Sequence, residues 1–177
     1  MVQPMQQERS AYLVARDSPA IDLMGPTIQL LGEPEELDGG ICAMLGTIPP
    51  GAIVPLHSHA DPETFLMIAG ELEGFADAEN GGRWLRIEPG GVFHVPGGAR
   101  HAFRNRTRVS AVSYIVSTPR MARFFLEIGN VLTPGAAVPP VTPETLRHFQ
   151  DTAQRYGYWN ATPEENAEIG LTLPPLH

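Results

Sequence analysis

The segment HSHADPE, residues 57–63, places metal-ligand side chains in an otherwise mostly apolar part of the chain. His57 and His59 stand one residue apart, and Glu63 follows four residues after the second histidine. Because alternate side chains of a strand face the same side, the two histidines point the same way if the segment is extended. Asp61-Pro62 predicts a bend before Glu63, so this argument is weaker for the carboxylate. The segment is therefore either a ligand set for a first-row transition metal or a polar surface loop.

A second stretch, GGVFHVPGGARHAFRN at residues 90–105, has its own regular spacing of turn residues and a histidine. Together the two stretches resemble the two signature motifs of the cupin superfamily. The first motif is a glycine, five residues, HxH, three residues, Glu, six residues and Gly, and the second is a glycine, five residues, PxG, two residues, His, three residues and Asn. Every fixed position is filled here, by Gly51, His57, His59, Glu63, Gly70, Gly90, Pro96, Gly98, His101 and Asn105.

The resemblance implies a small barrel in which the two hairpins lie side by side and His101 joins the first motif. His57, His59, Glu63 and His101 would then hold one divalent transition metal ion, which could be Fe, Mn, Ni, Co, Cu or Zn. Four protein ligands on an octahedral ion leave two positions open for catalysis. Glu63 would be both a ligand and the general base that takes a substrate proton. Asn105 belongs to the turn framework in the family and is expected to have no chemical role.

The spacing of glycine and proline, 18 residues each, predicts an all-β fold. These residues recur at short intervals through residues 25–100, which is typical of short strands joined by tight turns. The predicted strands are residues 27–31, 41–48, 64–68, 72–76, 84–87, 92–95, 102–105 and 111–116. With the resemblance, we expect a cupin barrel (a double-stranded β-helix or jelly roll) over residues 26–118, preceded by an N-terminal arm, residues 1–25.

After Pro119 the pattern changes to helix. The stretch RMARFFLEIGNVL, residues 120–132, has apolar residues at helical spacing. Thr142-Pro143 predicts the start of a second helix that runs to about Tyr156. Thr162, with Glu165 three residues later, predicts a capping box for a short third helix. We therefore expect residues 119–177 to form a C-terminal helical extension of the barrel.

The composition of the chain limits the classes of partner that the protein is expected to bind. The formal net charge of −8 argues against nucleic acid and against an anionic membrane surface, because both need a positive patch. No run approaches the roughly 20 apolar residues of a membrane span. The single cysteine, Cys42, allows no intrachain disulfide, which fits a reducing compartment. We expect a cytoplasmic protein that binds a small-molecule substrate, with O2 as a second partner for an oxygenase; the resemblance also implies a homodimer.

Every second residue of a strand faces the same side, so counting by two from the candidate ligands predicts which side chains line a substrate pocket beside the metal. The residues that it selects are Ile53, Pro55, Phe65, Met67 and Phe103. This apolar lining favours an apolar or aromatic substrate over a sugar or carboxylate, which would call for arginine or lysine. The alternative is that these side chains only fill the interior of a small barrel.

The segment ARFFLEIGN, residues 122–130, is similar to the helix after the barrel in many single-domain cupins related to quercetin 2,3-dioxygenase. That resemblance implies a metal-dependent dioxygenase that binds the hydroxyl of a phenolic or enolic, flavonol-like substrate and cleaves a carbon–carbon bond with O2. The same four ligands serve cupin isomerases and lyases, which consume no O2, and a non-catalytic small-molecule-binding cupin is a further alternative. The fold alone does not choose among these activities.

Overall fold

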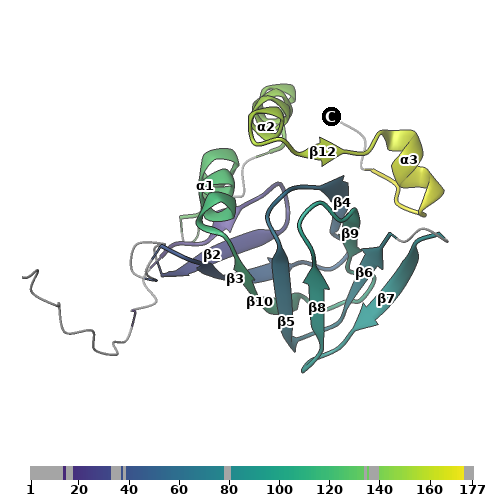
Figure 1. Cartoon of the computed structure of the whole chain (residues 1–177), viewed down its shortest axis with the longest axis horizontal. Helices are drawn as coiled ribbons and strands as arrows, with labels where there is room; N and C mark the ends of the chain where they lie inside the picture. Colours follow the sequence, from purple (N-terminus) through teal and green to yellow (C-terminus); the bar gives the residue numbers. More distant parts are fainter. Residues whose placement is uncertain are drawn as a thin grey trace, which may run out of the picture.

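Two antiparallel sheets face each other, and the C-terminal helices lie along one end of them (Figure 1). This computed structural model describes residues 14, 18–32, 37, 39–77, 81–133, 135 and 140–173. Most of the predicted N-terminal arm, residues 1–13 and 15–17, lies outside the described residues, as do residues 174–177 at the end of the predicted extension. The arrangement confirms the predicted all-β jelly roll followed by helices.

In the described part of the chain the first sheet has seven strands and the second has five. The first contains, in spatial order, β11 (Asn130–Val131), β1 (Ile21–Asp22), β2 (Thr27–Gly32), β3 (Cys42–Ile48), β10 (Ala111–Ser117), β5 (Glu63–Ala69) and β8 (Val92–Val95). The second contains β12 (Trp159–Asn160), β4 (Ile53–Ser58), β9 (His101–Arg104), β6 (Leu72–Ala76) and β7 (Arg83–Ile87). The two predicted motifs are thus divided between the sheets, because β4 and β9 pair in the second sheet while Glu63 begins β5 in the first.

Period-two burial explains why these segments form strands around a common core. Along β10 every second residue is buried, and in β3 Cys42 and Met44 are fully buried while Ala43 between them is not. Side chains from both sheets meet in the core, as Phe65 of β5 and Phe103 of β9 do with ring centroids 4.6 Å apart. Cys42 is a core residue, as expected for a small apolar side chain.

All eight predicted strands are present, with ends that differ by at most one residue from those observed. The prediction missed β4 and the two-residue strands β1, β11 and β12. β4 contains Pro55 and an irregular burial pattern, both of which weaken a strand signal. The two-residue strands are too short to show any periodicity and exist because of distant pairing partners.

The first helix is shorter than predicted. α1 (Pro119–Ile128) begins after the N-cap Thr118 and ends before Gly129, so the expected helix over residues 120–132 is wrong at its C-terminal end. The reason is tertiary: Asn130–Val131 leaves the helix to pair with β1.

The other two helices agree with their cap signals. α2 (Pro143–Arg155) has Thr142 as its N-cap and is followed by Gly157, whose φ of 71° only glycine adopts easily. α3 (Pro163–Glu168) begins with the predicted capping box of Thr162 and Glu165. Among the described residues, no helix has the length and apolar character needed to cross a bilayer.

Candidate metal centre

The three motif histidines meet at one end of the barrel. His57, His59 and His101 can each offer one ring nitrogen within 4.8 Å of the other two. The ring centroids of His57 and His101 lie 4.2 Å apart, and those of His59 and His101 lie 5.1 Å apart. The ladder between β4 and β9 is responsible, because His57 and His101 are paired residues in its register. The structure therefore brings the second motif to the first, as the resemblance implied.

The turn of the second motif packs directly on the loop that carries His59. The backbone N–H of Gly98 donates to the carbonyl oxygen of His59 at 2.6 Å, and Gly98 has a φ of 83°. At Gly97 a Cβ atom would lie 2.3 Å from the carbonyl oxygen of Ala60. Gly97 is therefore needed for the close approach of the two motifs, and Gly98 for the left-handed conformation of the turn.

Glu63 reaches the histidines from the opposite sheet. Its Oε2 lies 3.2 Å from Nε2 of His59 and 3.3 Å from Nε2 of His101, and the side chain is buried. The carboxylate therefore contacts two of the three histidines directly. All four residues predicted as ligands come together, supplied by β4, the loop after it, β5 and β9.

Backbone carbonyls orient all three imidazole rings. Nδ1 of His57 lies 2.8 Å from the carbonyl oxygen of Pro55, Nδ1 of His59 lies 2.8 Å from that of Asp61, and Nδ1 of His101 lies 3.0 Å from that of Ala99. A carbonyl oxygen only accepts, so each Nδ1 carries the proton and each Nε2 of a neutral ring presents a lone pair. This is the arrangement that holds metal-binding histidines in place in other proteins.

The charge states of the site suit metal binding. Burial alone raises the pKa of the Glu63 carboxyl, but hydrogen bonds from His101 and His59, which form when these rings carry a second proton on Nε2, outweigh burial and bring the pKa to about 2. Burial, followed by the neighbouring His101 and His59, lowers the pKa of His57 to about 3. At neutral pH the site therefore holds an anionic carboxylate beside a neutral imidazole, the forms that bind a cation.

One atom of the site has no hydrogen-bond partner. Nε2 of His101 is fully buried and makes no well-directed hydrogen bond among the described residues. A buried acceptor without a partner costs about 1–3 kcal/mol. Lone pairs from imidazole and carboxylate that face one another across about 3 Å need a cation between them, so the donor set fits a divalent transition ion.

Three of the predicted pocket residues lie inside the barrel, and one of them, Phe103, lies next to the histidines. Phe65, Met67 and Phe103 are buried in the core cluster, and the ring of Phe103 is 5.8 Å from that of His101, measured between centroids. Phe103, with the ring of Phe65 packed against it, forms an apolar floor beneath the histidines.

The structure does not bring Ile53 to this pocket. The register of β4 against β9 shifts between Val54 and His57, where β4 has an extra residue. The bulge reverses the same-side count, so Val54 packs on the interior core while Ile53 packs on a second cluster outside. Pro55, within the bulge, is exposed.

Asn105 is a framework residue, as expected. Its amide nitrogen donates to the carbonyl oxygens of Ile48 and Val109, and its oxygen accepts from the backbone and hydroxyl of Thr107. It is almost completely buried and ties the end of the second motif to the neighbouring strand.

The sequence did not reveal Tyr158, which lies against the histidines. Its ring centroid is 4.8 Å from that of His59 and 6.5 Å from that of His57. The rings of Tyr158 and His57 are nearly parallel. Tyr158 belongs to residues 156–160, which cross the end of the barrel between α2 and α3 and which we call the C-terminal strap (Figure 1). The run YGYWN has no motif spacing that singles out one of its aromatic residues, so only the fold shows the place of Tyr158.

A buried acid beside the centre links the ligand loop to the C-terminal extension. The Asp61 carboxylate accepts hydrogen bonds from the Thr118 hydroxyl and the Arg120 guanidinium. The same guanidinium donates to the carbonyl oxygen of Tyr156 in the strap. Asp61 also offers its own carbonyl to His59, so one short loop orients a candidate ligand and anchors the extension.

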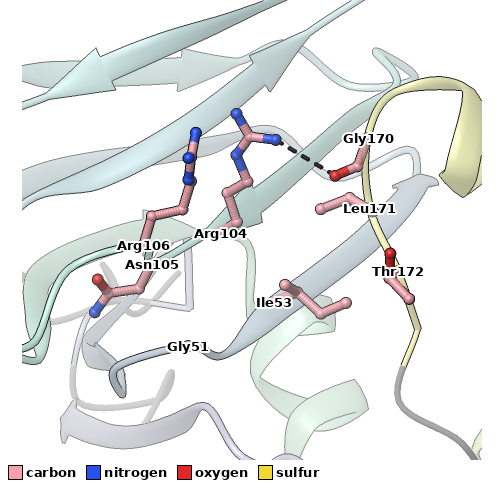
Figure 2. A pocket seen from close by; sticks show the side chains of 8 residues that line it. All are labelled: Gly51, Ile53, Arg104, Asn105, Arg106, Gly170, Leu171 and Thr172. Carbon is pink, nitrogen blue, oxygen red and sulfur yellow. Dashed lines mark hydrogen bonds between the residues drawn. The ribbon is translucent and has the colours of Figure 1, made fainter.

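A groove lies on the outside of the barrel, apart from the histidines (Figure 2). It has a volume of about 590 Å³ and runs between the start of β4, the end of β9 and residues 170–172. Arg104 in its wall is already occupied, since it pairs with Glu73 at 2.6 Å and its guanidinium lies over the ring of Trp84. The guanidinium of Arg104 is therefore not free to bind a ligand in the groove.

An antiparallel jelly roll with three histidines and a carboxylate converging at one end defines the class of this protein as a β-barrel with a candidate metal centre. Its residues 44–117 match the family model described as "Cupin domain". The matched segment includes all four candidate ligands. The search of curated proteins finds no match.

Solved structures share this fold at low sequence identity. Oxalate decarboxylase from Bacillus subtilis is 22% identical with a TM-score of 0.51, over 66% of this chain and 32% of that one. A predicted oxalate decarboxylase from Thermotoga maritima is 18% identical with a TM-score of 0.51, over 60% and 98% of the two chains. KdgF from Halomonas sp. is 14% identical with a TM-score of 0.51, over 62% and 94%. For several similar structures, including oxalate decarboxylase, the match covers less than two thirds of the length of the other chain.

Proposed function

We propose that His57, His59, Glu63 and His101 bind one divalent transition metal ion and that the protein is a metal-dependent cupin enzyme. The observation that carries this proposal is the convergence of three Nδ1-protonated imidazoles and one carboxylate on a common buried point. Such an ion would supply Lewis-acid activation of a substrate hydroxyl and, if redox-active, electrons for O2.

The leading activity is a dioxygenase that cleaves a phenolic or enolic, flavonol-like small molecule, similar to quercetin 2,3-dioxygenase. Aromatic surroundings support this choice, because Phe103 and Tyr158 lie next to the histidines and Phe65 packs on Phe103. In this reaction Glu63 accepts the proton of the substrate hydroxyl, and the apolar floor excludes water from the reacting atoms. The hydrogen bonds from Nδ1 to backbone carbonyls keep the three imidazole rings in place while the Glu63 side chain moves.

Two measurements test the proposal. Elemental analysis of protein prepared without added metal should find about one transition metal per chain, and an absence of metal that persists after incubation with Mn, Fe, Co, Ni, Cu and Zn would contradict it. A screen of flavonols and other enols in an oxygen electrode should then find O2 uptake with turnover. Turnover without O2 uptake would replace the dioxygenase with an isomerase or lyase of the same centre.

The Glu63→Gln variant separates the roles of the carboxylate. We expect activity to fall at least about 100-fold while metal content falls less, because general acid–base catalysis contributes roughly that much. Glu71→Gln is the matched control, since Glu71 forms an exposed ion pair with Arg86 away from the site. Equal losses of metal and activity in the Glu63 variant would make this residue a ligand only.

A further inference from the structure

The strap places an aromatic ring against the candidate ligands. The Tyr158 ring packs on His59 on one side and stacks on Phe124 of α1 on the other, with centroids 4.8 Å and 4.2 Å away. Its hydroxyl donates to the sulfur of Met121 at 3.0 Å. The ring therefore fills the space between the histidines and α1.

The backbone of the strap is fixed to the strand that carries His57. β12 pairs with the end of β4, so that Asn160 lies opposite His57 and Trp159 lies opposite Ser58. The backbone N–H of Ala161, just beyond the strap, donates to the carbonyl oxygen of Leu56 at 2.9 Å. The position of Tyr158 thus follows from regular strand pairing as well as from side-chain packing.

The four candidate ligands differ in how exposed their side chains are. His59, Glu63 and His101 are at most 4% exposed, whereas His57 is only half-buried. The barrel floor closes the site below, and Tyr158 closes it beside His59. His57 is therefore the most exposed of the four candidate ligands.

From this geometry we infer that Tyr158 is a specificity-determining wall of the metal centre, which shields one side of the ion and limits the size of the molecules that reach it. The inference rests on the proposed metal site and adds a residue from outside the cupin domain to the recognition of its substrate. The ring, and not the hydroxyl, provides the barrier, because the hydroxyl is turned toward Met121.

Removal of cobalt by chelators tests this role without any substrate. Protein loaded with Co²⁺ is mixed with excess of a small chelator, dipicolinate, or a bulkier one, EDTA, and loss of the cobalt absorption gives a rate for each. Tyr158→Ala should lose Co²⁺ about 10-fold faster or more, a change of the size seen when groups around metal ligands are altered. The variant should also discriminate less between the two chelators than the unmodified protein does.

Two variants serve as controls. Tyr158→Phe keeps the ring and should behave like the unmodified protein. Tyr156→Ala removes a neighbouring ring of the same strap that packs on Phe124 and not on the histidines, and it should also leave both rates unchanged. Equal rates for Tyr158→Ala and the unmodified protein would overturn the inference, as would equal acceleration by Tyr158→Phe or Tyr156→Ala. Failure of the unmodified protein to bind Co²⁺, Mn²⁺, Ni²⁺ or Zn²⁺ would instead overturn the metal centre itself.

Discussion

At the scale of single residues, the chemistry of the site depends on local hydrogen bonds between each histidine ring and a nearby backbone carbonyl. Each histidine donates its Nδ1 proton to a carbonyl two residues away, so the conformation of the loop sets the tautomer of the ring. The lone pairs on Nε2 are thereby directed to one point before any ion binds. This preorganisation lowers the cost of assembling the centre.

Removal of His101 tests whether the two motifs contribute ligands to one metal site. His101→Ala should weaken Co²⁺ binding by at least about 10-fold, measured by equilibrium dialysis, because one of three nitrogen donors is lost. His94→Ala provides the control, since His94 lies in the same motif but is exposed and bonds to Thr64. Unchanged affinity in the His101 variant would show that the metal binds elsewhere.

Acid should destabilise the metal-free protein through two of the ligands. The pKa of His57 is about 3 in the folded protein against 6.5 ordinarily, and that of Glu63 is about 2 against 4.5. Both groups therefore bind protons more tightly in the unfolded chain. The stability that His57 contributes is complete above about pH 6.5 and is lost as the pH falls toward 3, and that of Glu63 is lost between about 4.5 and 2.

Urea unfolding of the metal-free protein between pH 7.5 and 4 measures this effect. The free energy of unfolding should decrease as the pH is lowered, and His57→Gln should flatten the decrease between about pH 6.5 and 4.5. Identical pH profiles for the two proteins would show that His57 titrates normally in the folded state.

Residue spacing pointed to His57, His59 and Glu63 as candidate ligands, and His101 was added because both motifs resemble those of cupins. The lining was harder to predict. Ile53 was misplaced because a bulge of one residue reverses which side chains face the interior, and nothing local in the sequence marks it except Pro55. Tyr158 was missed because its neighbours are about a hundred residues away in the chain.

At the scale of elements, tertiary pairing decided what periodicity could not. The eight strands with clear alternation and breakers were predicted within one residue, whereas β1, β11 and β12 have two residues each and depend on partners elsewhere. The same cause ended α1 early, because Asn130 and Val131 pair with β1. Among these, β12 matters most, since it seals the edge of the sheet beside His57.

Arg120 connects three elements, and its removal should show how firmly the extension is held. Arg120→Ala leaves the buried Asp61 carboxylate with a single hydroxyl partner and frees the carbonyl of Tyr156. We expect the free energy of unfolding, measured in urea, to fall by about 1–3 kcal/mol. Arg155→Ala is the matched control, because Arg155 and Glu127 form an exposed ion pair, and its effect should be much smaller. A smaller loss for Arg120→Ala than for the control would contradict the anchoring role.

At the scale of the whole molecule, the C-terminal extension contributes Tyr158 to the surroundings of the candidate metal centre. α1, α2 and α3 surround the strap along the end of the barrel where the histidines lie (Figure 1). The helix caps could be predicted from local signals, but the place where the extension packs could not, because it depends on contacts between distant parts of the chain.

Metal binding should therefore stabilise the molecule as a unit. A ligand at 100 times its dissociation constant adds about 2.7 kcal/mol to the folded state, which corresponds to an increase of roughly 5–10 °C in Tm for a chain of this size. Differential scanning fluorimetry with and without Co²⁺ measures the shift. His101→Ala should abolish most of it, and an equal shift in that variant would place the stabilising ion at another site.

The most direct measurement is anomalous X-ray diffraction from crystals of the metal-loaded protein, collected on both sides of the absorption edge of the bound metal. We expect one strong anomalous peak about 2.0–2.3 Å from Nε2 of His57, His59 and His101, with Glu63 beside it. A peak located elsewhere, or no peak near these nitrogens in crystals soaked with excess metal, would contradict this expectation.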